Sequence, residues 1–569
     1  MRELFRRFFA HPGLTLQLII TTFVIALLGL ATSLFVIQVL NRFISHGVNS
    51  TLTSLAVGTL IAVVFELSFR SLRRRLIVAQ NRDDSDRLSE AAFSVLLQTQ
   101  QSALDRVSFG QRHEILRGVD SIRAVTMPQN VAALLDFPFA LLFVFVLWLL
   151  SPVLAFISVA AMGLSLLMAM VVQMGGRRGI KQAQEVAAER AGILGSAVSA
   201  AETIRAFNGA NFLSRGWGES DSMLARLRNR LFSSRDALQS RMGMVGSLQT
   251  VAIVSVGALQ VVNGDLTVGA MIGANILAGR ALMPLTRLSQ MGETFATAKQ
   301  AGDILREFMK MPLERIKGSG LKQYAGRVEL QELAFSYPGS SIQLFESVNL
   351  TLEPGKTLAV VGPNGSGKTT FVRMLVGLLE PAKGQILVDN LDLRQIALPW
   401  WRMQLSYIPQ EPLFVTGTIE ENIALANPKI TPERLNEVIR IAGLRPFLDS
   451  SQDGLSMVIR EGGRHLALGI RRRLALARAL ATGGNLFIAD EPTEGLDGEG
   501  RRAVYALFQQ LRGEGKTIIV ISHDQEFLKI ADYLMDLGVK PTPGIQARQS
   551  GSGTEPNKGV AAVAQKRAE

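Results

Sequence analysis

Long apolar runs dominate the first 300 residues of the chain. Six of them approach the roughly 20 residues that an α-helix needs to cross the hydrocarbon core of a bilayer. Buried helices of a soluble protein are the alternative interpretation, but several of the runs reach full membrane-spanning length. The pattern therefore predicts six transmembrane helices, at residues 15–40, 51–69, 130–150, 152–173, 243–263 and 266–288.

Two long polar stretches separate these runs, at residues 76–127 and 174–240. Both are rich in Arg, Glu, Gln and Ala, and both are too long to be simple turns. We expect helices that continue the spans beyond the membrane by tens of ångströms, at about 1.5 Å per residue.

The pattern changes after about residue 327, where short apolar runs alternate with helical segments. Residues 357–361, 486–489 and 517–521 are typical of buried strands in a mostly parallel sheet. The sequence thus predicts a multidomain protein, with a six-helix all-α transmembrane domain followed by an α/β domain. We place these parts at residues 1–300 for the membrane domain, 301–326 for a linker, 327–540 for the α/β domain and 541–569 for a disordered tail rich in Pro, Gly, Ser, Gln and Lys.

Charge adds an orientation to this picture. The formal net charge is +12, but arginines gather beside the apolar spans, at residues 2–7, 70–75 and 177–178. This placement favours membrane topology over nucleic-acid binding, and the positive-inside rule puts both termini in the cytoplasm. The chain contains no cysteine, which excludes disulfides, thiolate metal sites and cysteine nucleophiles.

A phosphate-binding loop occupies residues 362–370, which read GPNGSGKTT and follow a predicted strand. Its glycines let backbone N–H groups face phosphate oxygens, and the following helix N-terminus favours an anion. Lys368 is suited to reach the β- and γ-phosphates, and Thr369 to supply a hydroxyl to Mg²⁺. We therefore predict ATP and Mg²⁺ as cofactors, with ATP held by Tyr337, Gly362, Pro363, Asn364, Gly365, Ser366, Gly367, Lys368, Thr369 and Thr370.

Further candidates for the chemistry follow other predicted strands. Asp490 ends the run LFIA and suits a Mg²⁺ ligand, while Glu491 is placed to polarise the attacking water. His523 follows the run TIIVIS, and Gln410 ends YIPQ. Tyr337 precedes a Pro-Gly turn, where stacking on adenine and simple packing both remain open. The predicted catalytic residues are Glu491, His523 and Gln410, and the predicted metal ligands are Thr369, Gln410 and Asp490.

The order of these motifs resembles that of the ATP-binding cassette (ABC) exporters. Their aromatic loop, Walker A, Q-loop, Walker B, D-loop and switch histidine correspond to Tyr337, residues 362–370, Gln410, residues 490–493, residues 496–497 and His523. The resemblance implies that the α/β domain is a P-loop ATP-binding cassette and that the protein is an ATP hydrolase coupled to transport. Six spans before one cassette is the half-transporter layout, which implies a dimer with a second half-transporter.

The membrane half resembles the type I secretion ATPases of Gram-negative bacteria, in residues 34–44, 134–146 and 264–285. That resemblance implies export of a polypeptide across the bacterial inner membrane, with the ATPase domain in the cytoplasm. It also implies a membrane fusion protein and an outer-membrane channel as partners, membrane lipid around the spans and no nucleic acid. An exporter of lipid, peptide or small molecule, and a poorly hydrolysing regulatory subunit, are the alternatives.

The sequence departs from this family at its signature segment. The family's L-S-G-G-Q falls on Leu466, Ala467, Leu468, Gly469 and Ile470. In the family this segment covers the γ-phosphate held by the partner subunit, and Ala467 has no hydroxyl to offer. The lost hydrogen bond to a charged group is worth roughly 1.5–3 kcal/mol. Glu494 and Gly495 also stand where Ser and Ala are usual. The departure predicts an asymmetric or heterodimeric transporter.

Overall fold

The computed structural model describes residues 11–44, 49–337, 339 and 343–547 of the chain. They divide into two compact units. The first is helical and is drawn from residues up to 312 except 100–102, and the second contains 100–102 and the residues from 313 onward. Each unit has an apolar core of its own.

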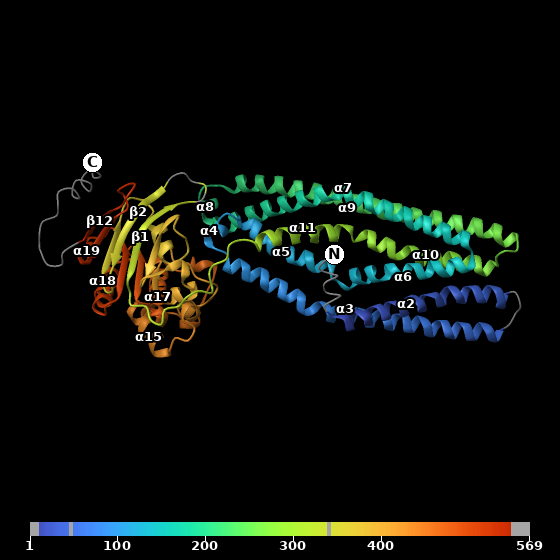
Figure 1. Cartoon of the computed structure of the whole chain (residues 1–569), viewed down its shortest axis with the longest axis horizontal. Coiled ribbons are helices and arrows are strands. Elements are labelled where there is room, and N and C mark those ends of the chain that lie inside the picture. Colours follow the sequence, from blue (N-terminus) through green and yellow to red (C-terminus); the bar gives the residue numbers. More distant parts are fainter. Residues whose placement is uncertain (1–10, 45–48, 338, 340–342, 548–569) are drawn as a thin grey trace. The chain divides into compact units, whose positions relative to one another are not determined.

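The first unit consists of long helices that run beside one another (Figure 1). Three of them continue without a break between apolar and polar halves, as the polar stretches predict: α3 and α7 pass from an apolar into a polar half, and α9 from a polar into an apolar half. In chain order the helices are α2 (Pro12–Gln38), the π-helix η1 (Val39–Ile44), α3 (Asn49–Gln98), α4 (Gln101–Leu104) at the division between the units, α5 (Phe109–Val125), α6 (Pro128–Leu150), α7 (Pro152–Ser199), α8 (Ala201–Ala206), α9 (Ala210–Val262), α10 (Val268–Gln290) and α11 (Gly292–Phe308).

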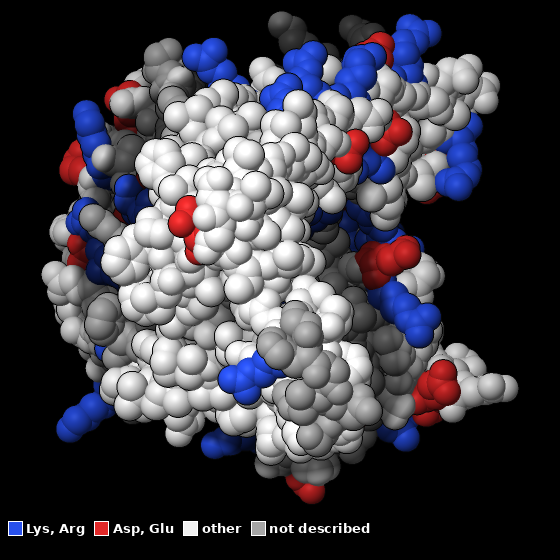
Figure 2. Space-filling view, turned by 90° about the vertical axis from the view of Figure 1, so that its right-hand side faces the viewer, with Lys and Arg blue, Asp and Glu red and all other residues white. Residues whose placement is uncertain are grey.

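The prediction of six spans is confirmed. Six helical segments are long and apolar enough to cross a membrane, and many large apolar side chains on them are exposed, as lipid-facing residues must be. Figure 2 looks along the helices of the first unit, whose surface nearest the viewer is mostly uncharged. The segments are Pro12–Ile44, Leu52–Gln80, Pro128–Leu150, Pro152–Gln173, Ala210–Val262 and Val268–Phe308.

Small residues let α10 approach α2 closely. A Cβ atom added at Gly273 would lie 2.3 Å from the side chain of Ile37, and one added at Gly269 would lie 2.5 Å from Asn41. Since lipid offers apolar helices no hydrophobic reason to associate, close backbone approach of this kind is what holds membrane helices together.

An ion cluster joins three helices near the polar ends of the spans. Asp136 of α6 accepts from Arg73 of α3, and its second oxygen lies 3.5 Å from Nη1 of Arg287 of α10. Arg73 is buried, so its charge depends on this carboxylate.

The predicted linker at residues 301–326 differs from the structure. Helix α11 continues to Phe308, because Leu305 and Phe308 pack against Ile115 and Val119 of α5. From residue 313 the chain belongs to the second unit, where Tyr324 is fully buried and meets Trp401 edge-on. The predicted linker is therefore corrected at its two ends, while residues 309–323 between them are exposed or half-buried and form no helix or strand.

The second unit contains two main sheets. A six-stranded sheet has the order β12-β11-β3-β10-β9-β6 and is parallel except for β12, and a four-stranded antiparallel sheet has the order β2-β1-β4-β5. The strands are β1 (Val328–Ser336), β2 (Gln343–Leu352), β3 (Thr357–Val361), β4 (Lys383–Val388), β5 (Leu391–Asp392), β6 (Leu405–Ile408), β7 (Gly417–Thr418), β8 (Val458–Ile459), β9 (Leu486–Asp490), β10 (Thr517–Ile521), β11 (Tyr533–Asp536) and β12 (Gly544–Ala547).

Helices pack on the parallel sheet and form a second apolar core with it. Among them, α17 contacts β6 and α12 contacts β9. The α-helices are α12 (Lys368–Leu375), α13 (Leu398–Met403), α14 (Ile419–Ile423), α15 (Pro432–Ile441), α16 (Arg445–Ser450), α17 (Leu468–Thr482), α18 (Gly498–Gly513) and α19 (Gln525–Ile530).

The predicted fold class of an all-α membrane domain followed by an α/β domain is confirmed, and β3, β9 and β10 lie where the apolar runs predicted strands. The expected disordered tail at residues 541–569 is corrected at its start. Residues 544–547 form β12, since their backbone pairs with the edge strand β11. Residues 548–569 of that tail, and the arginines at positions 2–7, lie outside the described residues.

Replacing Asp136 by Asn tests the ion cluster. Arg73 is then buried without its carboxylate, and because Asp136 keeps some contact with solvent we expect the unfolding free energy to fall by about 2 kcal/mol, less than for a fully buried pair. Denaturant unfolding in detergent micelles measures this change. The matched control, Glu307→Gln, removes an exposed pair with Lys310 and should leave stability nearly unchanged. Equal stability of the two variants would contradict the assignment.

Candidate functional site

The parallel strand register brings the predicted site segments to one edge of the sheet. Ile521 of β10 is paired with Val360 of β3 and with Asp490 of β9, and Ile408 of β6 is paired with Ala489. The segments that leave these strands at their carboxyl ends therefore emerge together, which is where open α/β sheets bind their ligands.

The phosphate-binding loop leaves β3 and opens α12. Gly362 has a φ of +145°, and a Cβ atom there would lie 2.8 Å from Oγ of Ser366. Gly367 has a φ of +104° at the N-cap of α12. Both positions need glycine, and the curled backbone turns N–H groups toward the concave side of the loop. The loop can therefore cradle an anion at a helix N-terminus.

Lys368 places its ammonium over the mouth of this loop. Its Nζ donates to the carbonyl oxygens of Gly362 and Pro363, at 2.6 and 3.2 Å. These weak neutral acceptors can be exchanged for phosphate oxygens, which bind an ammonium more strongly. The ammonium group of Lys368 is thus placed where it can bind a phosphate group held by the loop.

Thr369 and Asp490 present oxygen atoms side by side. The Thr369 hydroxyl donates to Oδ2 of Asp490 at 3.0 Å. A hydroxyl, a carboxylate and phosphate oxygens form the donor set that Mg²⁺ prefers at nucleotide sites. No cluster of three His, Cys, Asp or Glu side chains occurs within the described residues. The residues present thus fit a metal held jointly with a phosphate ligand, and not a cage built from protein alone.

Asp490 and Glu491 are adjacent, so their two carboxyl groups would bring negative charges close together at this edge of the sheet. Burial raises the pKa of Asp490, although the hydrogen bond from Thr369 and the charges of Lys368 and Arg373 oppose this effect. The pKa of Glu491 is raised by burial and then by the charge of Asp490, with Lys368 and Arg472 opposing. A divalent cation would relieve the crowding of these two charges.

His523 follows β10, and its Nε2 lies 3.9 Å from Oε1 of Glu491. Partial burial and the charge of Lys368 lower the pKa of His523, while Asp536 opposes them. The imidazole is therefore neutral near pH 7 and has one donor and one acceptor nitrogen available. Gln410 is exposed two residues after β6, at the same sheet edge.

Tyr337 sits against the first turn of α12. Its hydroxyl shares a hydrogen bond of 2.9 Å with Oγ1 of Thr370, and its ring meets Phe335 edge-on at 5.1 Å. The ring is still 44% exposed. The tyrosine is thus anchored by packing at one edge while part of its surface stays available for stacking.

The degenerate signature segment forms the start of α17. Ala467 is the N-cap residue, where its methyl group cannot accept a hydrogen bond from the helix. A Cβ atom at Gly495 would lie 2.9 Å from Cδ2 of Leu468, so the leucine occupies the space beside this glycine. Ile470 packs against the core of the same unit. The segment is therefore attached to residues of its own chain.

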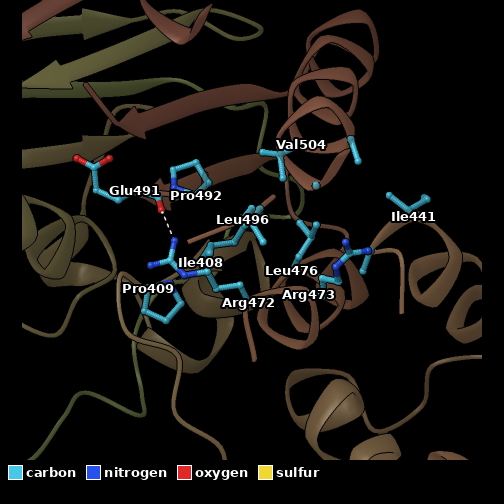
Figure 3. A pocket seen from close by; sticks show the side chains of 13 residues that line it. Ile408, Pro409, Ile441, Arg472, Arg473, Leu476, Glu491, Pro492, Leu496 and Val504 are labelled. Carbon is cyan, nitrogen blue, oxygen red and sulfur yellow. Dashed lines mark hydrogen bonds between the residues drawn. The ribbon is translucent and has the colours of Figure 1, made fainter. Parts of the chain in front are cut away.

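Sequence reasoning did not single out Arg472. Arg472 is 9% exposed and lines a small cavity with Pro409, Pro492 and Leu496 (Figure 3). A pattern could have indicated this burial, because Arg472 lies three and seven residues before Ala475 and Ala479, on the apolar face of a helix.

The requirement for glycine at Gly367 can be tested by Gly367→Ala. Left-handed backbone costs a residue with a Cβ atom about 1–2 kcal/mol, and the new methyl would lie 3.3 Å from Phe345, so we expect ATP affinity to fall roughly tenfold. Binding of a fluorescent ATP analogue gives the affinity. Gly513→Ala, at the end of α18 with open space around it, is the control and should bind normally. Unchanged affinity of the Gly367 variant would refute the constraint.

Comparisons with known proteins agree with this site and fold. A family profile described as "ABC transporter transmembrane region" matches residues 15–285, and one described as "ABC transporter" matches residues 345–494. The leukotoxin translocation ATP-binding proteins LktB of Mannheimia glucosida and Bibersteinia trehalosi are each 27% identical over 526 residues, covering 91% of this chain and 73% of the relative. A solved structure of a bacterial Atm1-family ABC exporter with ATP bound shares the fold, with a TM-score of 0.82 and 18% identity over 93% of this chain and 94% of that one.

The two profiles together match more than half of the chain and name the same family for both of its units. The solved structure extends the likeness to the arrangement of helices and strands. The chain therefore belongs to the ABC transporters and is an ATP-hydrolysing membrane transporter with the exporter fold.

Proposed function

We propose that this chain is the ATP-driven exporter subunit of a type I secretion system and moves a polypeptide across the bacterial inner membrane. The observation that carries this proposal is the match to leukotoxin translocation proteins over 91% of the chain, through the membrane unit as well as the ATPase. The positive-inside pattern supports a cytoplasmic ATPase domain. A membrane fusion protein and an outer-membrane channel would then complete the path to the outside.

The residues at the sheet edge divide the work of ATP hydrolysis. The loop at 362–370 holds the phosphates, and Lys368 neutralises the β- and γ-phosphoryl oxygens. Mg²⁺, held by Thr369 and Asp490, would neutralise charge that develops on the phosphates. Water attacks the γ-phosphorus, the bond to the β-phosphate oxygen breaks, and ADP leaves.

Glu491 orients the attacking water and accepts its proton, for which its raised pKa is suited. His523 faces Glu491 and would contact the γ-phosphate, and Gln410 would reach the metal or the water from the end of β6. Tyr337 would stack on adenine with its exposed surface.

The transporter works as a dimer in this proposal, and the partner is a second half-transporter. The face of this chain that holds its own ATP retains Lys368, Asp490, Glu491 and His523. The start of α17, which serves the partner's ATP, lacks the serine hydroxyl at Ala467. The combination favours an asymmetric pair in which a different subunit supplies an intact signature segment.

Glu491→Gln tests the catalytic assignment. The amide is nearly the same size but accepts no proton, so we expect ATP turnover to fall at least about a hundredfold with ATP binding retained. Phosphate release by the full-length protein with its partner measures turnover, and an ATP analogue measures binding. Lys368→Ala should lose binding itself. A Glu491→Gln variant that hydrolyses ATP at the normal rate would contradict the role.

Ala467→Ser tests the asymmetry. A serine at this N-cap should stabilise α17 by about 1 kcal/mol and return a hydroxyl to the face presented to the partner. We expect the purified chain on its own to hydrolyse ATP faster after this change. Vigorous hydrolysis by the unmodified chain alone, sensitive to Glu491→Gln, would show that no different partner is required.

A further inference from the structure

Arg472 is a buried guanidinium on α17, beside the residues that follow β9. It lines a cavity of about 30 Å³ together with Glu491, Pro492 and Leu496. A buried charge persists in a protein only where it is paired or hydrogen-bonded. The identity of its acceptors therefore indicates what the residue does.

Both acceptors belong to the loop that begins at Glu491. Nη1 of Arg472 donates to the backbone carbonyl oxygen of Glu491 at 3.2 Å, and Nη2 lies 3.1 Å from Oε2 of Glu494. The Nε atom is buried without a partner, so the guanidinium holds the loop through its two Nη atoms. Glu494 is 58% exposed, which makes the carbonyl of Glu491 the more buried of the two contacts.

The backbone at Glu491 is in an unfavourable conformation. Its φ is +50°, in the left-handed region that a residue with a side chain rarely adopts. Such a conformation persists when its surroundings fix it, and it is found most often at functional sites. Glu491 is held from both sides, since its N–H donates to Ile521 at 2.9 Å and its carbonyl accepts from Arg472 and from the N–H of Glu494 at 3.3 Å.

The backbone conformation sets the direction of the side chain. Figure 3 shows the carbonyl of Glu491 directed at Arg472, while its carboxylate extends away from the cavity. That carboxylate lies on the side of His523, 3.9 Å from Nε2. A different φ at Glu491 would turn the Cα–Cβ bond and move the carboxylate away from this position.

A second contact seats α17 on the same loop. Leu468 fills the space beside Gly495, whose φ of +69° is also left-handed. The loop thus meets the helix through a polar contact at Arg472 and an apolar contact at Leu468, and Nη2 of Arg473 lies 3.8 Å from Oδ1 of Asp497. Together they fix the distance between the helix and the backbone of Glu491.

We propose that Arg472 is a positioning residue for ATP hydrolysis, which locks the left-handed backbone of Glu491 and so aims its carboxylate. The proposal rests on the catalytic role proposed for Glu491. It also assigns α17 a task within its own subunit, in addition to any contact with a partner.

The principal test is Arg472→Gln in the full-length transporter with its partner. Without the hydrogen bond from Arg472 to its carbonyl, Glu491 should misplace its carboxylate. We therefore expect kcat to fall roughly ten- to hundredfold, as for other small misplacements of a catalytic group. The KM for ATP and the affinity for an ATP analogue should stay near the original values, because the hydrogen bonds of Arg472 go to Glu491 and Glu494 rather than to residues 362–370. A merely structural role would change both together or neither.

Three further variants sharpen the test. Arg472→Lys keeps the charge but cannot bridge two acceptors, so it should recover kcat only in part. Glu494→Gln leaves the bond to the Glu491 carbonyl and should lower kcat less than Arg472→Gln. Combined with Arg472→Gln it should add little, since both changes remove the same contact. Arg502→Gln removes an exposed arginine of α18 and is the matched control, with kcat expected at the original value.

Unchanged kcat in Arg472→Gln would overturn the proposal, as would an equal loss in Arg502→Gln or a rise in KM that accounts for the whole effect. Thermal unfolding shows whether Arg472→Gln folds. If it does not, Glu494→Gln and Arg472→Lys decide the question, and unchanged kcat in both would overturn the proposal.

Glu491→Gln is measured alongside, to separate failure of the positioning role from failure of the proposed function. If it retains turnover, the proposed function itself is wrong. If it loses turnover while Arg472→Gln does not, only the positioning role is wrong.

Discussion

The parallel pairing of β3, β10 and β9 is the constraint on which the rest of the site depends. Because Ile521 lies level with both Val360 and Asp490, three chain segments far apart in sequence leave the sheet side by side. One carries the phosphate-binding loop, one the two carboxylates and one His523. A shift of one residue along any of these strands would reverse which side chains face the helices, and a shift of β3 or β9 would also separate the Thr369 hydroxyl from Asp490. The fully buried Val, Ile and Leu side chains of these strands make such a shift costly. The apolar core therefore holds the strand register, and the register holds the polar site residues in place at the edge of the sheet.

A second level of control acts on the backbone of Glu491. The sheet delivers this residue to the edge, but its left-handed φ is not a consequence of strand pairing. It is held by donors from outside the strand, and one of them comes from the start of α17. Glu494 and Gly495, which depart from the family just before the D-loop, both contact this helix, Glu494 through Arg472 and Gly495 through Leu468. The sequence alone presents separate departures in the signature segment and before the D-loop, and in the structure these residues contact one another.

Features that depend on residues close together in the sequence could be predicted, whereas features that depend on residues far apart in the sequence could not. Membrane spans depend on the composition of a continuous run, and the phosphate-binding loop depends on nine consecutive residues, so both could be predicted. The buried strands β3, β9 and β10 were visible for the same reason. The four-stranded antiparallel sheet was not, because β1 and β2 are interrupted by irregular register and lack a clean alternation. Arg472 was visible only as a charge, since its acceptors lie 19 and 22 residues away and are reached through tertiary packing. The same limit explains why residues 301–308 at the end of α11, and Tyr324, were assigned to a linker.

These contacts change how the degenerate signature segment should be understood. Leu468 contacts Gly495 although its side chain stays 41% exposed, and Arg472 is buried against the backbone of Glu491. Both side chains therefore make contacts within their own subunit. In the proposed dimer, the serine hydroxyl missing at Ala467 would weaken what α17 offers to a partner's ATP, whereas Arg472 and Leu468 contact the loop that carries Glu491 in their own subunit. The proposed asymmetry would then reflect contacts made within one subunit rather than between subunits, and it would leave intact the face on which this chain holds its own nucleotide.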